Sequence, residues 1–410
     1  MRSIFVLTIL ATSPVLSAAT CIECHRTTTP NIVSDWQISK HAQNAVDCSI
    51  CHGSGHTSDY DVDKVSLPTP QTCKACHAAQ VEQFSKGKHA FGWASVKAMP
   101  TFHWQPMAMT EGMKGCGGCH KIGLKSEEEH KQLKAQGAGF GVASCDACHT
   151  RHTFSKTEAQ QPQACQTCHM GFDHPQWEMY SASKHGVRYL LKQNGTLPEE
   201  TAAPTCQKCH MQDGNHEVRT AWGFLAVRLP MPEDKQWAAD RVTLLKGLGV
   251  LDPDGKPTGR LEVVKQAQVA RLTQEEWQAE RDKMLKTCNQ CHSMNFAKAE
   301  LDKGDRMIQE ADRLMAEAIE IVAGLYRDGV IAKPKEYAYA YPDLLTFHDA
   351  ATPVETVLHE MHLEHRMRTF QGTFHANPDY ALWYGWAAMK KSLTEIRYLA
   401  AEMRAHHRER

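Results

Sequence analysis

The fold of this chain is decided by three stretches: GCGGCH at 115–120, SCDACHTRH at 144–152 and ACQTCHMGFDH at 164–174. Each contains two cysteines that are separated by two residues and followed directly by a histidine. This CxxCH pattern is typical of c-type haem attachment, in which the thiols form thioether bonds to the porphyrin and the histidine ligates the iron from one face. The stretches therefore predict a protein that is folded around haem.

All 16 cysteines of the 410-residue chain fall in eight such motifs. CxxC alone would also suit a zinc site or a disulfide scaffold. However, only 24 residues are histidine, too few for one to follow every pair by chance. We predict eight covalently bound c-type haems. The attachment cysteines are Cys21, Cys24, Cys48, Cys51, Cys73, Cys76, Cys116, Cys119, Cys145, Cys148, Cys165, Cys168, Cys206, Cys209, Cys288 and Cys291, and the proximal ligands are His25, His52, His77, His120, His149, His169, His210 and His292.

The first 19 residues have the pattern of an export signal. Arg2 gives a positive start, residues 4–10 are apolar, and Ser17-Ala18-Ala19 is a small-residue cleavage site. The apolar run is much shorter than the ~20 residues that span a membrane, and no later stretch is apolar enough to do so. We expect a soluble, periplasmic protein after removal of signal peptide 1–19. The net charge of −1 does not favour nucleic acid as a partner.

Seven motifs lie within the 196 residues from Cys21 to His216, about 28 residues for each haem. That is too little polypeptide for an ordinary apolar core, so the porphyrins themselves are expected to form the interior. We predict a mainly α multihaem cytochrome c fold with an octahaem domain at 20–292. A charged segment, Lys121–Gln136, is predicted to be an exposed helix, and Asp252–Gly255 a plain turn.

A helical region, 293–410, is expected to follow. A capping box at Thr273–Glu276 predicts the start of a helix that leads to the eighth motif. Beyond His292, apolar residues recur at helical spacing up to Gly329. They are Met307, Leu314, Ala318, Ile321, Val322 and Leu325. A second helical region, Val354–Arg404, is expected to break near Asn377-Pro378. These apolar faces are interpreted as core or subunit interface.

Sixteen histidines lie outside the motifs. An electron-transfer haem needs a second axial ligand, whereas a catalytic haem keeps that position open. Six of the seven segments between motifs offer one: His41, His56, His89 or His103, His152, His174 or His185, and His216. Motif four is followed only by His130, inside the charged segment. The count favours an open haem at His120, but the alternative in which all eight irons are six-coordinate and the protein only conducts electrons remains.

The chain resembles the hydroxylamine oxidoreductase family of octahaem cytochromes c over nearly all of its mature length. The matching residues are ECH to SKHA at 23–42, CHTRHTFS at 148–155, GFDHPQWEMYSASKHG at 171–186, APTCQKCHM at 203–211, CNQCHSMNFA at 288–297 and HANP at 375–378. The resemblance implies seven bis-histidine haems and an open fourth haem. It gives the distal ligands as His41, His56, His89, His152, His185, His216 and His375. It also implies that Asp173 and His174 lie over the open face, where a histidine held by a carboxylate can shuttle protons.

The chain departs from the oxidising members of that family in two places. They carry a tyrosine near the C-terminus that bonds covalently to the catalytic porphyrin of a neighbouring subunit. Here the stretch reads NPDYALWYGW (377–386), which aligns Leu382 or Trp383 with it, while Tyr380 and Tyr384 are displaced. A second tyrosine of the oxidases, beyond Trp222, is replaced by Phe224-Leu225.

Members without the cross-linking tyrosine are thought to run reductively. The resemblance therefore implies a periplasmic oxidoreductase that reduces nitrite and/or hydroxylamine towards ammonia at haem four. The alternatives are a hydroxylamine or hydrazine oxidase and a non-catalytic electron-transfer protein. No CxxCK motif occurs, unlike in the lysine-ligated ammonia-forming nitrite reductases. The expected partners are a small nitrogen compound and a redox partner, either a small cytochrome c or a membrane quinol dehydrogenase. A homotrimer is expected, built by the helices after residue 293.

Overall fold

The computed structural model describes residues 18–96, 115–135, 144–171, 173–220, 229–266, 272–333, 339–346 and 350–409. In these ranges all regular elements are helical, apart from one isolated bridge between Leu251 and Pro257. The predicted mainly α fold is confirmed. Among the described helices, none is both long and apolar enough to cross a membrane. The predicted signal peptide lies almost wholly outside the described residues.

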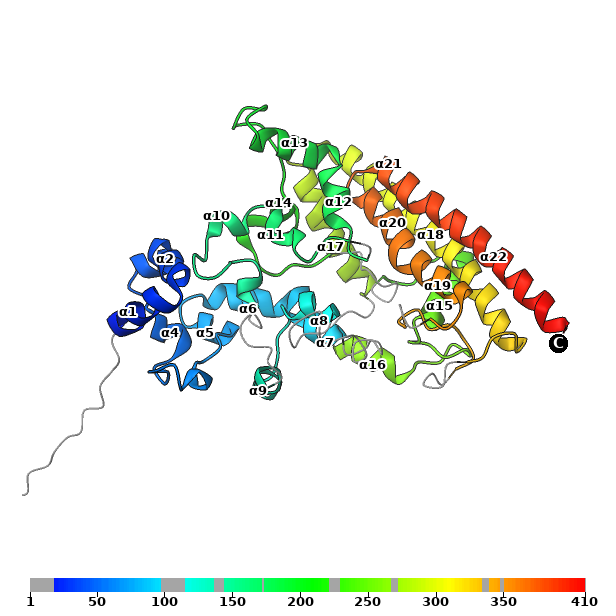
Figure 1. Cartoon of the computed structure of the whole chain (residues 1–410). Helices are drawn as coiled ribbons and strands as arrows, with labels where there is room; N and C mark the ends of the chain where they lie inside the picture. The colour runs from blue at the N-terminus through cyan, green and yellow to red at the C-terminus, as the bar shows by residue number, and fades with distance from the viewer. Residues whose placement is uncertain are drawn as a thin grey trace, which may run out of the picture.

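The motif-bearing half is built from short helices joined by turns (Figure 1). They are α1 (Ala18–Thr28), α2 (Pro30–Ile38), α3 (Lys40–Gln43), α4 (Cys48–His52), α5 (Pro70–Lys74), α6 (Ala78–Lys86), α7 (Gly92–Val96), α8 (Gly115–His120), α9 (Glu127–Ala135), α10 (Lys156–Ala159), α11 (Gln163–Gln166), α12 (Gln176–Ser181), α13 (Lys184–Gln193) and α14 (Cys206–His210). Helices α4 and α14 each begin at the first cysteine of a motif and end at its histidine. One such turn places residues i, i+3 and i+4 on the same side, as attachment to a single porphyrin requires.

Longer helices make up the rest of the molecule. They are α15 (Lys235–Gly247), α16 (Gly259–Gln266), α17 (Gln274–Cys288), α18 (Met294–Arg327), α19 (Pro353–Glu360), α20 (Arg366–Phe374), α21 (Pro378–Tyr380) and α22 (Ala387–Arg408), with π-helical turns at Met361–His365 and Ala381–Trp386. Helices α18 and α22 run side by side towards the C-terminus (Figure 1). The large apolar core lies among α15, α18, α19 and α22.

The apolar stripe of α18 is core, not interface. Leu314, Ala318, Val322 and Leu325 are fully buried within one chain, because α15, α20 and α22 pack on this helix. These four residues therefore need no second subunit to cover them. Its predicted end is confirmed, since α18 stops shortly before Gly329, which has a positive φ.

Three other local predictions can be compared with the structure. The capping box is present: Thr273 and Glu276 exchange side-chain to backbone hydrogen bonds at the start of α17. Residues 252–255 form a turn. The charged segment is only partly helical, because α9 begins at Glu127 after a non-helical stretch in which Lys125 lies half-buried against the ring of Trp93.

The predicted break in the helical region near Asn377 is confirmed. The residues at this break also contact the motif-bearing half of the molecule. Ala376 has a positive φ of 54°. The side chain of Asn377 accepts a hydrogen bond from the Tyr380 amide and donates one of 3.0 Å to the carbonyl of Met179 in α12. The break thus places the C-terminal helices next to the segment that follows motif six.

Candidate functional site

An iron with two histidine ligands fixes the distance between their rings. An imidazole nitrogen lies about 2 Å from a first-row metal that it ligates and about 1.2 Å from the centre of its own ring, so the two ring centres are about 6.3 Å apart. Six of the seven expected distal histidines lie at this distance from a motif histidine. The pairs are His25–His56 (6.1 Å), His77–His41 (6.2 Å), His52–His152 (6.2 Å), His169–His89 (6.0 Å), His149–His216 (6.3 Å) and His292–His185 (6.1 Å).

The seventh expected distal histidine, His375, acts electrostatically on the motif histidine His210. Burial, with a further contribution from the neighbouring His375, lowers the pKa of His210 to about 4. Burial likewise lowers the pKa of His375. Both rings are therefore neutral at pH 7, as a metal ligand must be. The six pairs by their spacing, and His210 with His375 by their electrostatic interaction, fit a set of bis-histidine c-type haems.

The order of the histidines along the chain does not show which distal histidine pairs with which motif histidine. His41 follows motif one but lies beside His77 of motif three. His152 follows motif five but lies beside His52 of motif two. Distal histidines reach across to other motifs because the short helices fold back on one another, which only the tertiary structure shows.

When one ring nitrogen of a histidine ligates iron, the other nitrogen, which we call the outer nitrogen, points away from it. In several of these histidines the outer nitrogen contacts an oxygen, which fixes the ring orientation. Five partners are neutral: Thr29 Oγ1 for His25 (2.8 Å), Ser66 O for His52 (3.2 Å), Gly92 O for His120 (2.9 Å), Gln176 Oε1 for His169 (3.3 Å) and Gln371 O for His375 (2.8 Å). The partner of His56 is instead a carboxylate, Asp61 Oδ1, at 2.9 Å. Asp61 is not among the residues predicted from the sequence, where the only signal was an acidic residue five positions from an expected ligand.

The His120 ring faces His174, with 6.2 Å between the ring centres. This equals the spacing of the other pairs, so distance alone does not distinguish an axial ligand from a side chain that faces a bound substrate. Two features set His174 apart. It lies 6.0 Å from a second motif histidine, His169, which already has His89 as its partner. In addition, its Nδ1 faces the adjacent Asp173 carboxylate at 3.2 Å.

The Asp173–His174 pair is partly buried, with about a third of the Asp173 side chain and a quarter of the His174 side chain exposed. Burial opposes ionisation of Asp173. The hydrogen bond and the electrostatic attraction of His174 outweigh it, so the pKa of Asp173 is lowered. Burial also lowers the pKa of His120, against the opposing effect of its bond to Gly92. The site therefore combines a neutral proximal imidazole with an ionised carboxylate that holds a second imidazole.

Other candidates lie elsewhere or outside the described residues. His130 is in α9 and has no ring contact with any described histidine. His103 and Phe224-Leu225 fall outside the described residues. Tyr180, which follows the Asp173–His174 pair in sequence, is buried and donates a hydrogen bond to the Pro204 carbonyl, so it is a packing residue. At the position expected to correspond to the cross-linking tyrosine of the oxidases, Leu382 and Trp383 are exposed, with Tyr384 beside them.

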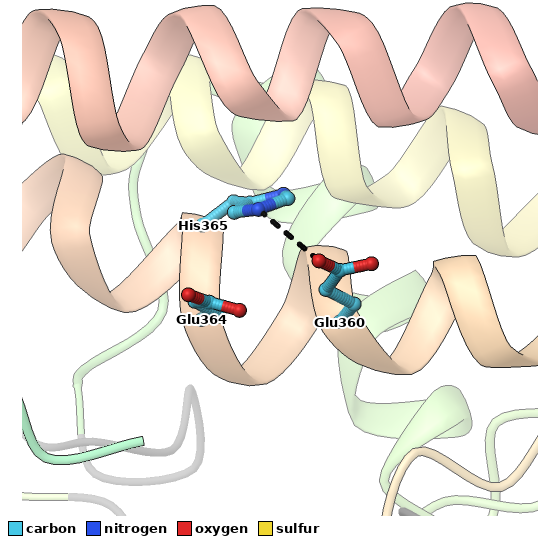
Figure 2. Close-up of side chains that lie close together, drawn as sticks. All are labelled: Glu360, Glu364 and His365. Carbon is cyan, nitrogen blue, oxygen red and sulfur yellow. Dashed lines mark ion pairs between the residues drawn. The ribbon is translucent and has the colours of Figure 1, made fainter. Parts of the chain in front are cut away.

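A second cluster of metal-binding residue types lies in the π-helical turn of the C-terminal region (Figure 2). Its members are Glu360, Glu364 and His365. The wide turn brings His365 to the side of the two carboxylates, and its Nε2 lies 3.8 Å from Glu360. Glu364 is paired with Arg368 at 2.5 Å, and His365 Nδ1 contacts Ser392 at 3.0 Å. Because Arg368 and Ser392 already interact with Glu364 and His365, we assign no metal ion to this cluster.

Comparisons with known proteins show the family and the fold of the chain. The family described as "Seven times multi-haem cytochrome CxxCH" matches residues 17–241 and 260–337. A Kuenenia stuttgartiensis protein described as "Probable nitrite reductase-hydroxylamine oxidoreductase fusion protein" is 28% identical over 485 aligned residues, covering 94% of this chain and 51% of the relative. The chain thus spans about half the length of that relative.

Two solved structures share the fold. The "reducing HAO-like protein complex" of K. stuttgartiensis superposes with a TM-score of 0.67 at 24% identity, covering 95% of this chain and 86% of that chain. A "Hypothetical multiheme protein" superposes with a TM-score of 0.65 at 20% identity, covering 95% and 96%. At these identities the structures show the fold alone.

Proposed function

Since the chain belongs to the family of multi-haem CxxCH cytochromes and has the fold of hydroxylamine-oxidoreductase-like proteins, we propose that it reduces nitrite, hydroxylamine or both towards ammonia. The reaction is assigned to the haem held by Cys116, Cys119 and His120. The seven other haems, each between two histidines, conduct electrons to it. The observation that carries this proposal is the contrast between seven motif histidines with a dedicated partner and His120, whose neighbour belongs to an Asp–His pair.

When bound, a haem without a distal protein ligand supplies an iron with an exchangeable position and a store of electrons. The chain supplies protons and orientation. Asp173 fixes the His174 ring through Nδ1, which leaves Nε2 to hold a proton or release it. Gly92 accepts from His120 Nδ1 and fixes the proximal ring. Reduction of nitrogen oxides consumes protons with every electron pair, so a positioned donor speeds it.

The reductive direction is proposed because residues 382 and 383 are Leu and Trp. Neither has the phenol oxygen through which a tyrosine bonds to porphyrin. The relative from K. stuttgartiensis is named for both nitrite reductase and hydroxylamine oxidoreductase, which is consistent with chemistry on small nitrogen compounds. Tryptic mapping for a porphyrin-linked tyrosyl peptide, together with assays in both directions, tests the proposal. An adduct at Tyr380 or Tyr384, with oxidation of hydroxylamine faster than reduction, would show an oxidase instead.

A second candidate function, electron transfer without catalysis, is favoured by one observation. The 6.2 Å between His120 and His174 would also suit two axial ligands of one iron. Electron paramagnetic resonance of the oxidised protein separates the two functions. The reductase should show one high-spin ferric haem that becomes low-spin when cyanide is added. Eight low-spin haems and no effect of cyanide would leave electron transfer only.

The cellular setting is also part of the proposal. We place the mature protein in the periplasm, as a homotrimer that receives electrons from a small cytochrome c or a membrane quinol dehydrogenase. Exposed aromatic side chains support self-association: Trp383 and Tyr384 are 68% and 59% exposed. They follow the break at Asn377 and lie on the surface of a helical turn, where a second copy can reach them.

A further inference from the structure

We propose that Asp61 makes the haem between His25 and His56 the lowest-potential haem of the chain, by a hydrogen bond from the distal ligand His56. This inference rests on the proposed pairing of these two histidines on one iron. It does not depend on which reaction the His120 haem performs.

The contact is well defined. His56 Nδ1 lies 2.9 Å from Asp61 Oδ1, so the other nitrogen, Nε2, is the one available to iron. The ring centre of His56 is 6.1 Å from that of His25, as one shared iron requires. The side chains of His56 and Asp61 are 26% and 12% exposed, so solvent competes little for the bond.

The loop that follows motif two holds Asp61 as a carboxylate. Its oxygens accept hydrogen bonds from the Thr57 amide, the Ser58 amide and the Thr57 hydroxyl, each 2.9 Å long. Lys64 lies 3.7 Å away. Donors directed at both oxygens stabilise the charged form, and an acceptor with a full negative charge makes a stronger bond than a neutral one.

Among the described axial histidines, His56 alone has a carboxylate at hydrogen-bond distance. The other outer-nitrogen partners are the neutral carbonyl, amide and hydroxyl oxygens given above. A carboxylate draws the Nδ1 proton towards itself and makes the ring a more basic ligand. A more basic ligand stabilises ferric over ferrous iron, so the haem is harder to reduce than its neighbours.

The position of this haem indicates how a low potential would affect electron flow. Helices α1, α2 and α4 lie at the end of the molecule away from the C-terminus of α22 (Figure 1). An electron that enters at this end from a strongly reducing donor would pass from the lowest-potential haem to haems of higher potential. Asp61 thus gives direction to the electron-transfer chain.

The test is a spectropotentiometric titration of the fully loaded protein, resolved by electron paramagnetic resonance. In Asp61→Asn the lowest-potential component should shift upward while the others stay in place. The matched control, Thr57→Val, removes one support of the carboxylate but leaves the Asp61–His56 bond, and should cause no comparable shift. His56→Met should alter the same component, which assigns it to this haem.

The outcomes are distinct. An unchanged lowest-potential component in Asp61→Asn, with all haems retained, would overturn the role of Asp61. If Asp61→Asn loses haem, Asp61→Ser replaces it, since serine keeps a small neutral oxygen, and the same upward shift is expected. If His56→Met leaves the lowest-potential component in place, that haem lies elsewhere and the inference fails. Activity is not the readout, so none of these results bears on the reaction proposed for the His120 haem.

Discussion

The histidines of this chain differ in the chemical group that contacts their outer ring nitrogen, and this difference bears on their function. A backbone carbonyl, such as Gln371 O beside His375, fixes a ring without adding charge. A carboxylate adds charge, as Asp61 does for His56 and Asp173 for His174. His362 is different again, because neither of its nitrogens has a hydrogen-bond partner among the described residues.

The first prediction concerns His174. His174→Ala should slow reduction of nitrite or hydroxylamine on the order of 10²-fold, the effect of losing a positioned proton donor. The low-spin haem spectra should stay unchanged, because His174 is not proposed as a ligand. Asp173→Asn should have a milder effect, since it weakens the hold on the ring but leaves the imidazole. Loss or gain of a low-spin haem signal in His174→Ala would identify His174 as an axial ligand.

The second prediction concerns pH. Burial, with further contributions from Arg366 and His359, holds the pKa of His362 well below its usual value. Below pH 6.5 the unfolded chain therefore binds more protons at this residue than the folded chain, and stability falls as the pH falls, by up to about 1.4 kcal/mol per pH unit.

His362→Leu removes both this sensitivity and the unpartnered nitrogens. Its unfolding temperature should match or exceed that of the wild type at pH 7, and the advantage should grow at pH 5. His407→Leu, on the exposed end of α22, is the control and should show no such growth. Equal acid sensitivity in the wild type and His362→Leu would contradict the prediction.

At the scale of elements, helix α18 depends on close approach to α20 at Gly304. A Cβ at this position would overlap the ring of Phe374, the last residue of α20. Phe374 is followed by His375, the proposed second ligand of the haem at His210. Packing in the helical region and ligation in the motif region are therefore coupled at this contact.

Gly304→Ala tests this coupling. It should lower the stability of the protein by about 1 to 3 kcal/mol, the usual cost of overpacking, and perturb the low-spin signal of one haem. Gly259→Ala, in α16, is the matched control: nothing lies within 4 Å of the added atom. It should leave both stability and spectra essentially unchanged. Thermal unfolding and electron paramagnetic resonance measure the two effects. If Gly304→Ala behaves like the control, the close approach is not needed.

At the scale of the whole molecule, one group of neighbouring exposed apolar side chains in the C-terminal region is a candidate contact for a second copy. The α18 stripe is covered within the chain, but Leu382, Trp383 and Tyr384 remain exposed on one π-helical turn. If this turn contributes to the proposed trimer, Trp383→Ser with Tyr384→Ser should shift the protein towards monomer in sedimentation velocity at micromolar concentration. Tyr60→Ser, at a 91% exposed aromatic residue of the motif region, is the control. A wild-type protein that sediments as a stable monomer would refute the trimer.

The sequence by itself determined the attachment chemistry and much of the local structure. CxxCH is contiguous, so the sites of covalent haem attachment can be found without a fold. Helix signals are also local: the capping box at Thr273 and the stop near Gly329 are where they were predicted. The first residue of α9 was misplaced, because charge pattern alone does not show that Lys125 packs on Trp93.

Only the tertiary structure decided which histidines face one another and which surfaces are covered. His41 lies beside His77, and the α18 stripe lies under α20 and α22, because residues far apart in sequence meet when the chain folds. The role proposed for Asp61 could not be predicted from the sequence either, because it depends on the folded loop. A carboxylate near a histidine can tune a haem potential only when the loop directs its oxygen to the outer ring nitrogen. Covalent chemistry is encoded by neighbours in sequence, whereas ligation, proton supply and potential depend on neighbours in space.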